Sequence, residues 1–284
     1  MKKLLTVLLA ATMSLSLCAC GEGDAEESSA AQESVSAAAS EDAAGNAEGN
    51  ESTGEAVQPS AEGGEASTDA QPVEQSEDEP ADMVDKSWFD DAIFVGDSVT
   101  LKLSYYAENG ALGDAAFLCA GSLSYYNALW DIDEENNVHP TLNGTKYTVD
   151  EGVAASGKKN VFIMLGMNDI GLNGVDDSIE NMKELIERIL NKSPEVEIYI
   201  QSVTPMLENM QGDMLNNTTI PQFNEKLQEV CEERGFVYLD VASAVSDEAG
   251  NLVPEYCGDP EAMGIHFTDA GCKRWVQYLR SHVE

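Results

Sequence analysis

Short apolar runs alternate with amphipathic helical patterns over the last 200 residues of this 284-residue chain. The runs are bounded by turn residues and have the length of strands that are buried on both faces, as in a parallel sheet. Parallel strands joined through helices require right-handed crossovers, so the pattern predicts a three-layer α/β fold in which helices flank a five-stranded parallel sheet. The predicted strands are Ala92–Val95, Ala116–Ala120, Val161–Leu165, Val196–Ile200 and Phe236–Leu239.

Three helices can be delimited between and after these runs. An apolar stripe runs from Ser178 to Leu190 and stops before a Ser-Pro pair. A second helix is predicted from about Pro221 to Arg234, with Gly235 as its C-terminal cap. The last helix is predicted over about Asp269 to His282, with Thr268 as its N-cap.

The segment from Asp131 to Lys159 interrupts this alternation. Asn143-Gly144 lies between two short runs with strand propensity, and this dipeptide is typical of a tight hairpin turn. We therefore expect an inserted loop or hairpin over residues 131–159, on the side of the sheet that binds the ligand.

The first twenty residues are typical of a secretion signal. Lys2 and Lys3 precede the apolar run Leu4–Leu17, which is shorter than a membrane-spanning helix. The run ends in Leu-Cys-Ala-Cys-Gly, which resembles the lipobox of bacterial lipoproteins with Cys20 as the acylated residue; an ordinary signal peptide with two incidental cysteines is the alternative. The resemblance implies a protein anchored by lipid at the extracellular face of the cytoplasmic membrane, without a span of its own.

Residues 21–84 have the composition of a disordered linker. They contain no Lys, Arg, Trp, Tyr or Phe, and 18 acidic residues lie between Glu22 and Asp82. Such a segment buries too little apolar surface to offset the entropy lost on ordering. We therefore predict an acidic linker over residues 21–84 and one folded domain over residues 85–284.

The net charge of −37 excludes several classes of partner. Residues 85–284 alone have 34 acidic and 13 basic side chains, a formal charge of −21. Nucleic-acid binding requires a basic face, so no nucleic-acid partner is predicted. The same charge repels anionic lipid, which leaves the lipid anchor as the only expected membrane contact, and it disfavours strongly anionic substrates.

The four cysteines of the predicted domain lack the spacing of metal ligands. Cys119, Cys231, Cys257 and Cys272 could form two disulfides in three ways, or remain buried free thiols. The chain has no His pair at ligand spacing and no phosphate-binding loop, so neither a metal nor a cofactor is predicted.

Four short motifs lie where predicted strands end or where the last helix begins. The carboxyl ends of parallel strands meet at one edge of a sheet, which is where such folds bind ligands. A serine becomes a strong nucleophile there only if a base accepts its proton, and His266 is the best placed of the three histidines. The motifs are Gly96-Asp97-Ser98, Ala120-Gly121-Ser122, Gly166-Met167-Asn168-Asp169 and Gly264-Ile265-His266-Phe267.

Ser98, Gly121, Asn168 and His266, in this order from about Ala92 to the end, resemble the four blocks of the SGNH, or GDSL-type, hydrolase superfamily. The resemblance implies a flavodoxin-like sheet of strand order 2-1-3-4-5 and a serine esterase activity. It also implies Ser98 as nucleophile, His266 as base, and an oxyanion hole made by the backbone N–H groups of Ser98 and Gly121 and the side-chain amide of Asn168. Taken singly, these residues could be a helix cap, a turn, a loop brace and a packed histidine.

The chain departs from the family pattern three residues before the histidine, where Met263 replaces the usual aspartate. A backbone carbonyl near Met263 could orient His266 in a Ser-His dyad, Asp259 or Glu261 could reach round to it, or activity could be weak or lost. We favour the dyad, because a carbonyl can also set the tautomer and orientation of the ring. The dyad predicts that Asp259→Ala and Glu261→Ala each retain most of the activity.

The substrate is predicted less directly. An extracellular location and a neutral-substrate preference favour acetyl esters of carbohydrate or cell-wall polymers. Tyr125, Tyr126 and Trp130 could stack on a sugar, or could equally be core residues. Asp97 and Asp169 are expected to brace loops. Two other hypotheses are a catalytically weak glycan-binding lipoprotein and a solute receptor, which would need two lobes.

Overall fold

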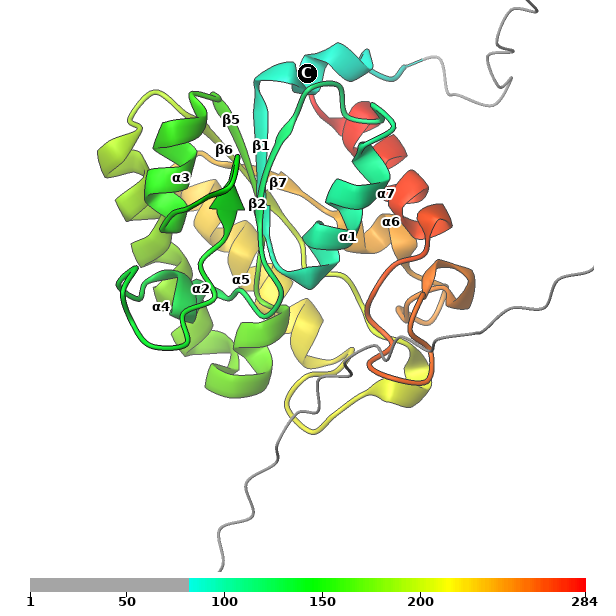
Figure 1. Ribbon diagram of the computed structural model, residues 1–284. Coiled ribbons are helices and arrows are strands. Elements are labelled where there is room, and N and C mark those ends of the chain that lie inside the picture. The colour runs from blue at the N-terminus through cyan, green and yellow to red at the C-terminus, as the bar shows by residue number, and fades with distance from the viewer. Residues whose placement is uncertain (1–81) are drawn as a thin grey trace, which may run out of the picture. The chain divides into compact units, whose positions relative to one another are not determined.

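A computed structural model describes residues 82–284 (Figure 1). The predicted signal peptide, the lipidation residue Cys20 and nearly all of the predicted linker lie outside the described residues. Between residues 82 and 284, no helix combines the length and the apolar character needed to cross a bilayer.

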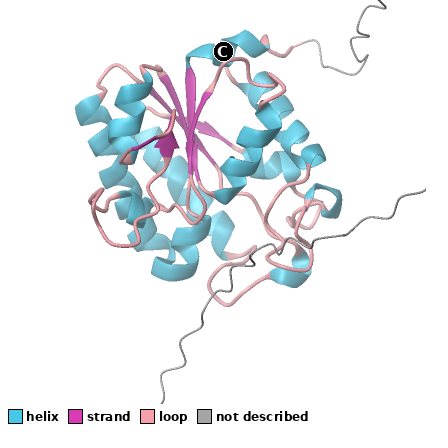
Figure 2. Ribbon diagram, in the orientation of Figure 1, coloured by secondary structure: helices cyan, strands magenta, loops and turns pink. Residues whose placement is uncertain are grey.

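Five parallel strands form one sheet with helices on both faces (Figures 1 and 2). They pair in the order β2-β1-β5-β6-β7. The numbers skip because β3 and β4 form a separate hairpin, so the sheet strands alone follow the predicted order 2-1-3-4-5. The strands are β1 (Ala92–Gly96), β2 (Ala116–Cys119), β5 (Asn160–Met164), β6 (Glu197–Gln201) and β7 (Val237–Leu239).

Successive residues of each strand point to opposite faces and so supply two hydrophobic cores. Ile93 and Val95 face one core, which is closed by α2 (Tyr125–Ala128), α3 (Val149–Ser156), α4 (Met167–Lys192) and α5 (Thr219–Arg234). Phe94 faces the other core, which is closed by α1 (Ser98–Ala107), α6 (Val241–Val245) and α7 (Asp269–His282). Residues 82–284 also contain three 3-10 helices: η1 (Lys86–Asp91), η2 (Glu208–Met210) and η3 (Pro254–Tyr256).

An aromatic row crosses three neighbouring strands on the second face. The strand register aligns Phe94, Phe162 and Tyr199. Their rings stack with centroids 4.7 Å apart for the first pair and 4.4 Å for the second. Each such pair adds about 0.5–1.5 kcal/mol beyond burial of its area, and the row therefore stabilises the central strands that carry the site.

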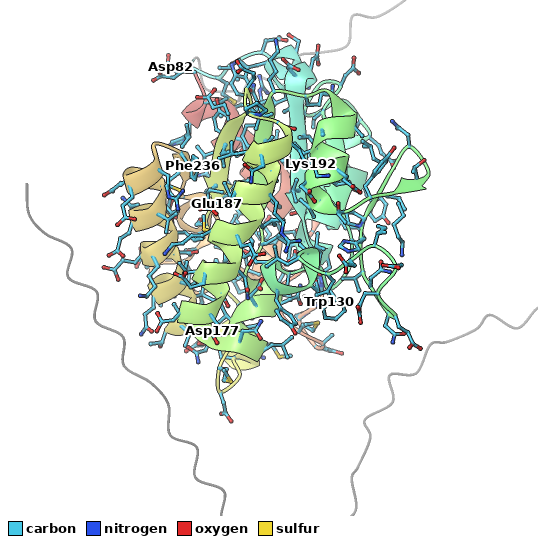
Figure 3. The ribbon with its side chains drawn as sticks, turned by 90° about the vertical axis from the view of Figure 1, so that its left-hand side faces the viewer. Asp82, Trp130, Asp177, Glu187, Lys192 and Phe236 are labelled. Carbon is cyan, nitrogen blue, oxygen red and sulfur yellow. The ribbon has the colours of Figure 1, made fainter. Side chains whose placement is uncertain are left out.

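The predictions for the last two helices are confirmed. The chain leaves α5 through Gly235 in the left-handed region, with φ at 74°. The Thr268 hydroxyl accepts the Gly271 N–H at 3.3 Å, which caps α7. The predicted Ser178–Leu190 helix lies inside the longer α4, whose regular turns are interrupted at Gly174 (φ 74°, ψ 179°). Figure 3 shows the later part of α4 from Asp177 to Lys192.

The hairpin prediction is confirmed, but the predicted insertion is too long. β3 (Thr141–Leu142) pairs antiparallel with β4 (Thr145–Lys146), and Asn143 and Gly144 both have positive φ in the turn. Helix α3, however, occupies the second half of the predicted insertion and is the crossover between β2 and β5. It is short and has only a narrow apolar stripe, which is why periodicity failed to reveal it.

The four cysteines of the described residues are free thiols, and the alternative of buried free thiols holds for three of them. Cys231, Cys257 and Cys272 are buried, and Cys119 is partly exposed at the end of β2.

Candidate active site

The nucleophile candidate, Ser98, is the first residue of α1 and follows β1, an inner strand of the sheet, after one intervening residue. Asp97 lies between β1 and α1, and its Oδ1 accepts the Val99 N–H at 2.9 Å. The helix cap is therefore Asp97, which leaves the Ser98 hydroxyl available for another partner. A helix N-terminus also favours negative charge that develops beside it.

His266 is the partner of Ser98. Its Nε2 lies 2.9 Å from the Ser98 Oγ, although the two residues are 168 positions apart. The imidazole side chain is 29% exposed, so it is open to a substrate while it is held in place. The predicted pairing of Ser98 with His266 is thus present in the structure.

Asp259 contacts His266 and completes a Ser-His-Asp triad, so the prediction of a Ser-His dyad is wrong. The Asp259 Oδ2 lies 2.7 Å from His266 Nδ1. A carboxylate can only accept at this contact, so Nδ1 carries the proton and Nε2 is left to accept from Ser98. Glu261 and Met263 are both exposed, and Asp259, seven residues before the histidine, takes the place of the usual aspartate.

The loop geometry explains how a residue seven positions away reaches the histidine. The Gly258 N–H donates to the His266 carbonyl at 2.7 Å, which closes the segment into a tight loop. Inside the loop, Asp259 Oδ1 accepts the backbone N–H groups of Ile265 and His266, each at 3.0 Å. The carboxylate is thereby tied to the same backbone that carries the imidazole, and its orientation does not depend on the residue at position 263.

The electrostatics of Asp259 suit this role. Burial raises the pKa of the Asp259 carboxyl, but the side-chain and backbone hydrogen bonds from His266 outweigh burial and hold the pKa below its ordinary value. Asp259 is therefore ionised at neutral pH and can stabilise a positive charge on His266.

Asn168 connects the first three motif blocks. Its Nδ2 donates to the Leu123 carbonyl at 3.0 Å and, at the longer distance of 3.4 Å, to Asp97 Oδ2. Leu123 follows Gly121 by two residues, and Asp97 precedes Ser98. Gly166, which precedes this block, has φ at 131°, and a Cβ there would overlap Phe223. Glycine is therefore required where β5 turns into α4.

Gly121 lies in the exposed turn after β2. The Ala120 N–H donates to the Gly96 carbonyl at 3.2 Å, which keeps this turn beside the end of β1. A Cβ at Gly121 would meet no atom within 4 Å, so neither backbone conformation nor packing demands glycine there.

Asp97 and Asp169 brace the loops beneath these groups, as the sequence predicts. Asp169 accepts the N–H groups of Tyr125 and Tyr126 at 2.9 and 3.0 Å, which anchors α2 to the start of α4. Burial raises the pKa of each carboxyl to about 6, against the opposing effect of the backbone hydrogen bonds. No cluster of His, Cys, Asp and Glu suited to a metal ion occurs within residues 82–284.

Comparisons with known proteins identify the family of the chain. A model of the GDSL-like lipase/acylhydrolase family matches residues 94–274, which include all four motif blocks and Asp259. No curated protein matches the chain. A solved structure assigned as a platelet activating factor from Streptococcus pneumonia has 20% identity and a TM-score of 0.52, and covers 73% of this chain and 85% of its own.

A protein assigned as an acylhydrolase from Bacteroides fragilis NCTC 9343 has 16% identity and a TM-score of 0.50, and covers 66% of this chain and 83% of its own. At these identities the likeness concerns the fold, whereas the family match spans more than half of the chain and includes the site. The chain therefore belongs to the GDSL-like lipase/acylhydrolase family, whose members are hydrolases that act on esters.

Proposed function

We propose that the protein is a lipid-anchored serine esterase that removes acetyl groups from neutral carbohydrate at the extracellular face of the cytoplasmic membrane. The observation that carries the catalytic part is the continuous chain of hydrogen bonds from Ser98 through His266 to Asp259. The location rests on the signal sequence and on Cys20, and the substrate rests on charge and on the residues around the site.

The proposed reaction proceeds in two steps. Ser98 Oγ attacks the ester carbonyl carbon while its proton passes to His266 Nε2; the bond to the alcohol then breaks, and the alcohol leaves with that proton. A water molecule next attacks the acyl-enzyme and gives a proton to His266, and Ser98 recovers its proton as the acid departs. Asp259 stabilises the imidazolium in both steps.

The oxyanion that forms in each step needs hydrogen-bond donors that are already in place. The Asn168 Nδ2 has two N–H groups and makes one short contact, to the Leu123 carbonyl at 3.0 Å, and one long contact, to Asp97 Oδ2 at 3.4 Å. We assign the N–H that does not bind Leu123 to the oxyanion, together with the backbone N–H groups of Ser98 and Gly121. The open space beside Gly121 supports this role, because a substrate needs room there.

Asn168→Ala is expected to lower kcat by about 10²–10³-fold, because loss of one oxyanion donor typically removes about 2.7–4 kcal/mol of transition-state stabilisation. KM should change little, since the donor matters most when the negative charge has developed. Steady-state kinetics on p-nitrophenyl acetate measure both constants. Asn137→Ala, which removes a loop amide that contacts none of the four motif blocks, is the matched control, and equal kcat values for the two variants would contradict the assignment.

Two observations favour a neutral carbohydrate. The formal charge of −21 over residues 85–284 repels polyanions. The rings of Tyr126 and Trp130 pack edge to face, with their centroids 5.7 Å apart. Both side chains are at least partly exposed (Trp130 is labelled in Figure 3). Tyr125, in contrast, is fully buried in the core. The Tyr126 N–H is bonded to Asp169, the residue after Asn168, so this aromatic pair is joined to the oxyanion side of the site and offers a surface for a sugar ring.

The competing hypotheses have lost their main support. A weakly active glycan-binding protein was suggested by Met263, but Asp259 supplies the missing acid. A solute receptor would need two lobes, whereas residues 82–284 contain one five-stranded sheet and a two-stranded hairpin.

Acetate release from acetylated xylan and from an acetylated polyuronate tests the substrate proposal. We expect faster release from the neutral polymer at low salt, and a difference that shrinks as added salt screens the domain charge. A preference for the polyanion, or p-nitrophenyl octanoate hydrolysis that exceeds acetate hydrolysis, would contradict the proposal. Globomycin treatment of cells, which blocks lipoprotein processing, tests the lipid anchor separately: unprocessed precursor should accumulate.

A further inference from the structure

A buried thiol lies against the catalytic carboxylate candidate. Cys257 is only 6% exposed, and its Sγ lies 3.4 Å from Asp259 Oδ1. The backbone of Cys257 is fixed from both sides: its N–H donates to the Pro254 carbonyl at 3.2 Å, and the residue forms an antiparallel bridge with Phe267. The thiol is therefore held in place by the same loop that carries His266.

The direction of this hydrogen bond follows from the chemistry of the groups. Burial raises the pKa of the Cys257 thiol; the Asp259 backbone lowers it through a hydrogen bond, but the Asp259 carboxylate raises it again, so the pKa stays above its ordinary value and the group remains an S–H donor. Asp259 Oδ1 then has three donors, namely this thiol and the N–H groups of Ile265 and His266. Oδ2 is left to face His266 Nδ1.

We propose that Cys257 is a positioning residue of the active site, whose thiol holds the Asp259 carboxylate so that Oδ2 faces the imidazole of His266. The two backbone donors belong to Ile265 and His266, whereas the thiol belongs to Cys257, which follows η3 and precedes Asp259 by two residues, so the donors reach the carboxylate from both ends of the loop and restrain its rotation. The inference rests on the proposed catalytic role of Ser98, His266 and Asp259.

Loss of the thiol should move the acid limb of the pH–rate profile in a predictable direction. Without this donor the negative charge on Asp259 is less stabilised, so the carboxylate binds a proton more readily, and it also attracts a proton on His266 more strongly. Either change removes the reactive form, in which Asp259 is ionised and His266 is neutral, at a higher pH than before. The acid limb of the pH–rate profile should therefore move upward.

Other titratable groups on the surrounding elements stay constant in this comparison. Asp97 lies across the site, where its charge is felt by His266. The loop and the 3-10 helices η2 and η3 around it contribute Glu208, Glu255, Tyr256 and Glu261. Lys102 on α1 and Asp269 at the start of α7 form an ion pair at 2.6 Å.

The test compares Cys257→Ala, which removes the donor, with Cys257→Ser, which keeps one. Cys272→Ala is the matched control, because Cys272 is fully buried in the same hydrophobic cluster but lies on α7. For Cys257→Ala we expect the acid limb of kcat/KM to move up by about half a pH unit, as suits one weak donor to a charged acceptor, with kcat/KM on that limb lowered by up to about threefold. Cys257→Ser and Cys272→Ala should keep the wild-type midpoint.

NMR titration of His266 in the full chain provides a readout that does not require turnover. The chain has three histidines, and His266→Ala identifies the signal of interest. Its midpoint should rise in Cys257→Ala alone. An unmoved midpoint in Cys257→Ala, or an equal shift in Cys257→Ser, would overturn the proposal, because packing would then suffice to explain the effect. If the wild type hydrolyses no ester, the proposed function fails, while the titration still decides the role of Cys257.

Discussion

Ser98→Ala is expected to reduce hydrolysis of p-nitrophenyl acetate by at least about 10⁵-fold, because the acyl-enzyme cannot form without the nucleophile. The residual rate should come only from binding and the oxyanion donors. Since Asp97 caps α1 and the Ser98 side chain contacts His266, the substitution leaves the helix cap intact. Thermal unfolding should therefore change little, and the loss can be attributed to chemistry.

A serine-directed fluorophosphonate gives a second measurement of the same prediction. The wild type should acquire one covalent adduct by intact-mass analysis, and peptide mapping should place it on Ser98. Ser104, on the same helix with its hydroxyl bonded to the Leu101 carbonyl, is the control position, and Ser104→Ala should label normally. Turnover that persists in Ser98→Ala, or an adduct on another residue, would exclude the proposed nucleophile.

Asp259→Asn is expected to lower kcat by about 10³–10⁴-fold, because an amide in place of the carboxylate favours the wrong imidazole tautomer and removes the charge that stabilises the imidazolium. This is the opposite of what the Ser-His dyad predicted from the sequence. The expectation follows from the 2.7 Å contact between Asp259 Oδ2 and His266 Nδ1. Kinetics on p-nitrophenyl acetate across pH 5–9 would measure the loss.

Glu261→Gln is the matched control, because it removes the other nearby acid from the same loop, where Glu261 is exposed. It should retain close to wild-type kcat. If Asp259→Asn kept most of the activity, the dyad would have to be reinstated, with a backbone carbonyl or water orienting the ring. If both variants lost activity equally, disruption of the loop rather than loss of a specific carboxylate would be the cause.

The layout of the sheet could be predicted from the sequence because buried parallel strands are local apolar runs. The prediction failed where the pattern was weak: α3 is short and has few apolar positions, so residues 149–156 looked like part of an insertion. The first half of α4 was also missed, because Gly171 and Gly174 break the helical pattern there. In both regions packing against the sheet, and not local propensity, stabilises the helix.

The site, like the fold, has residues that could be predicted from the sequence and residues that could not. Ser98, Gly121, Asn168 and His266 could be named from the sequence because their motifs resemble the four family blocks, and their positions at strand ends or at a helix start fit that resemblance because parallel strand ends converge. The roles of Asp259 and Cys257 could not be predicted from the sequence, since both depend on the loop that residues 257–267 form. The Gly258–His266 hydrogen bond brings a residue seven positions away within 2.7 Å of the imidazole. The sequence by itself thus determined the fold and the candidate nucleophile and base, whereas only the tertiary structure decided which carboxylate contacts the candidate base, because that choice rests on loop closure and not on spacing.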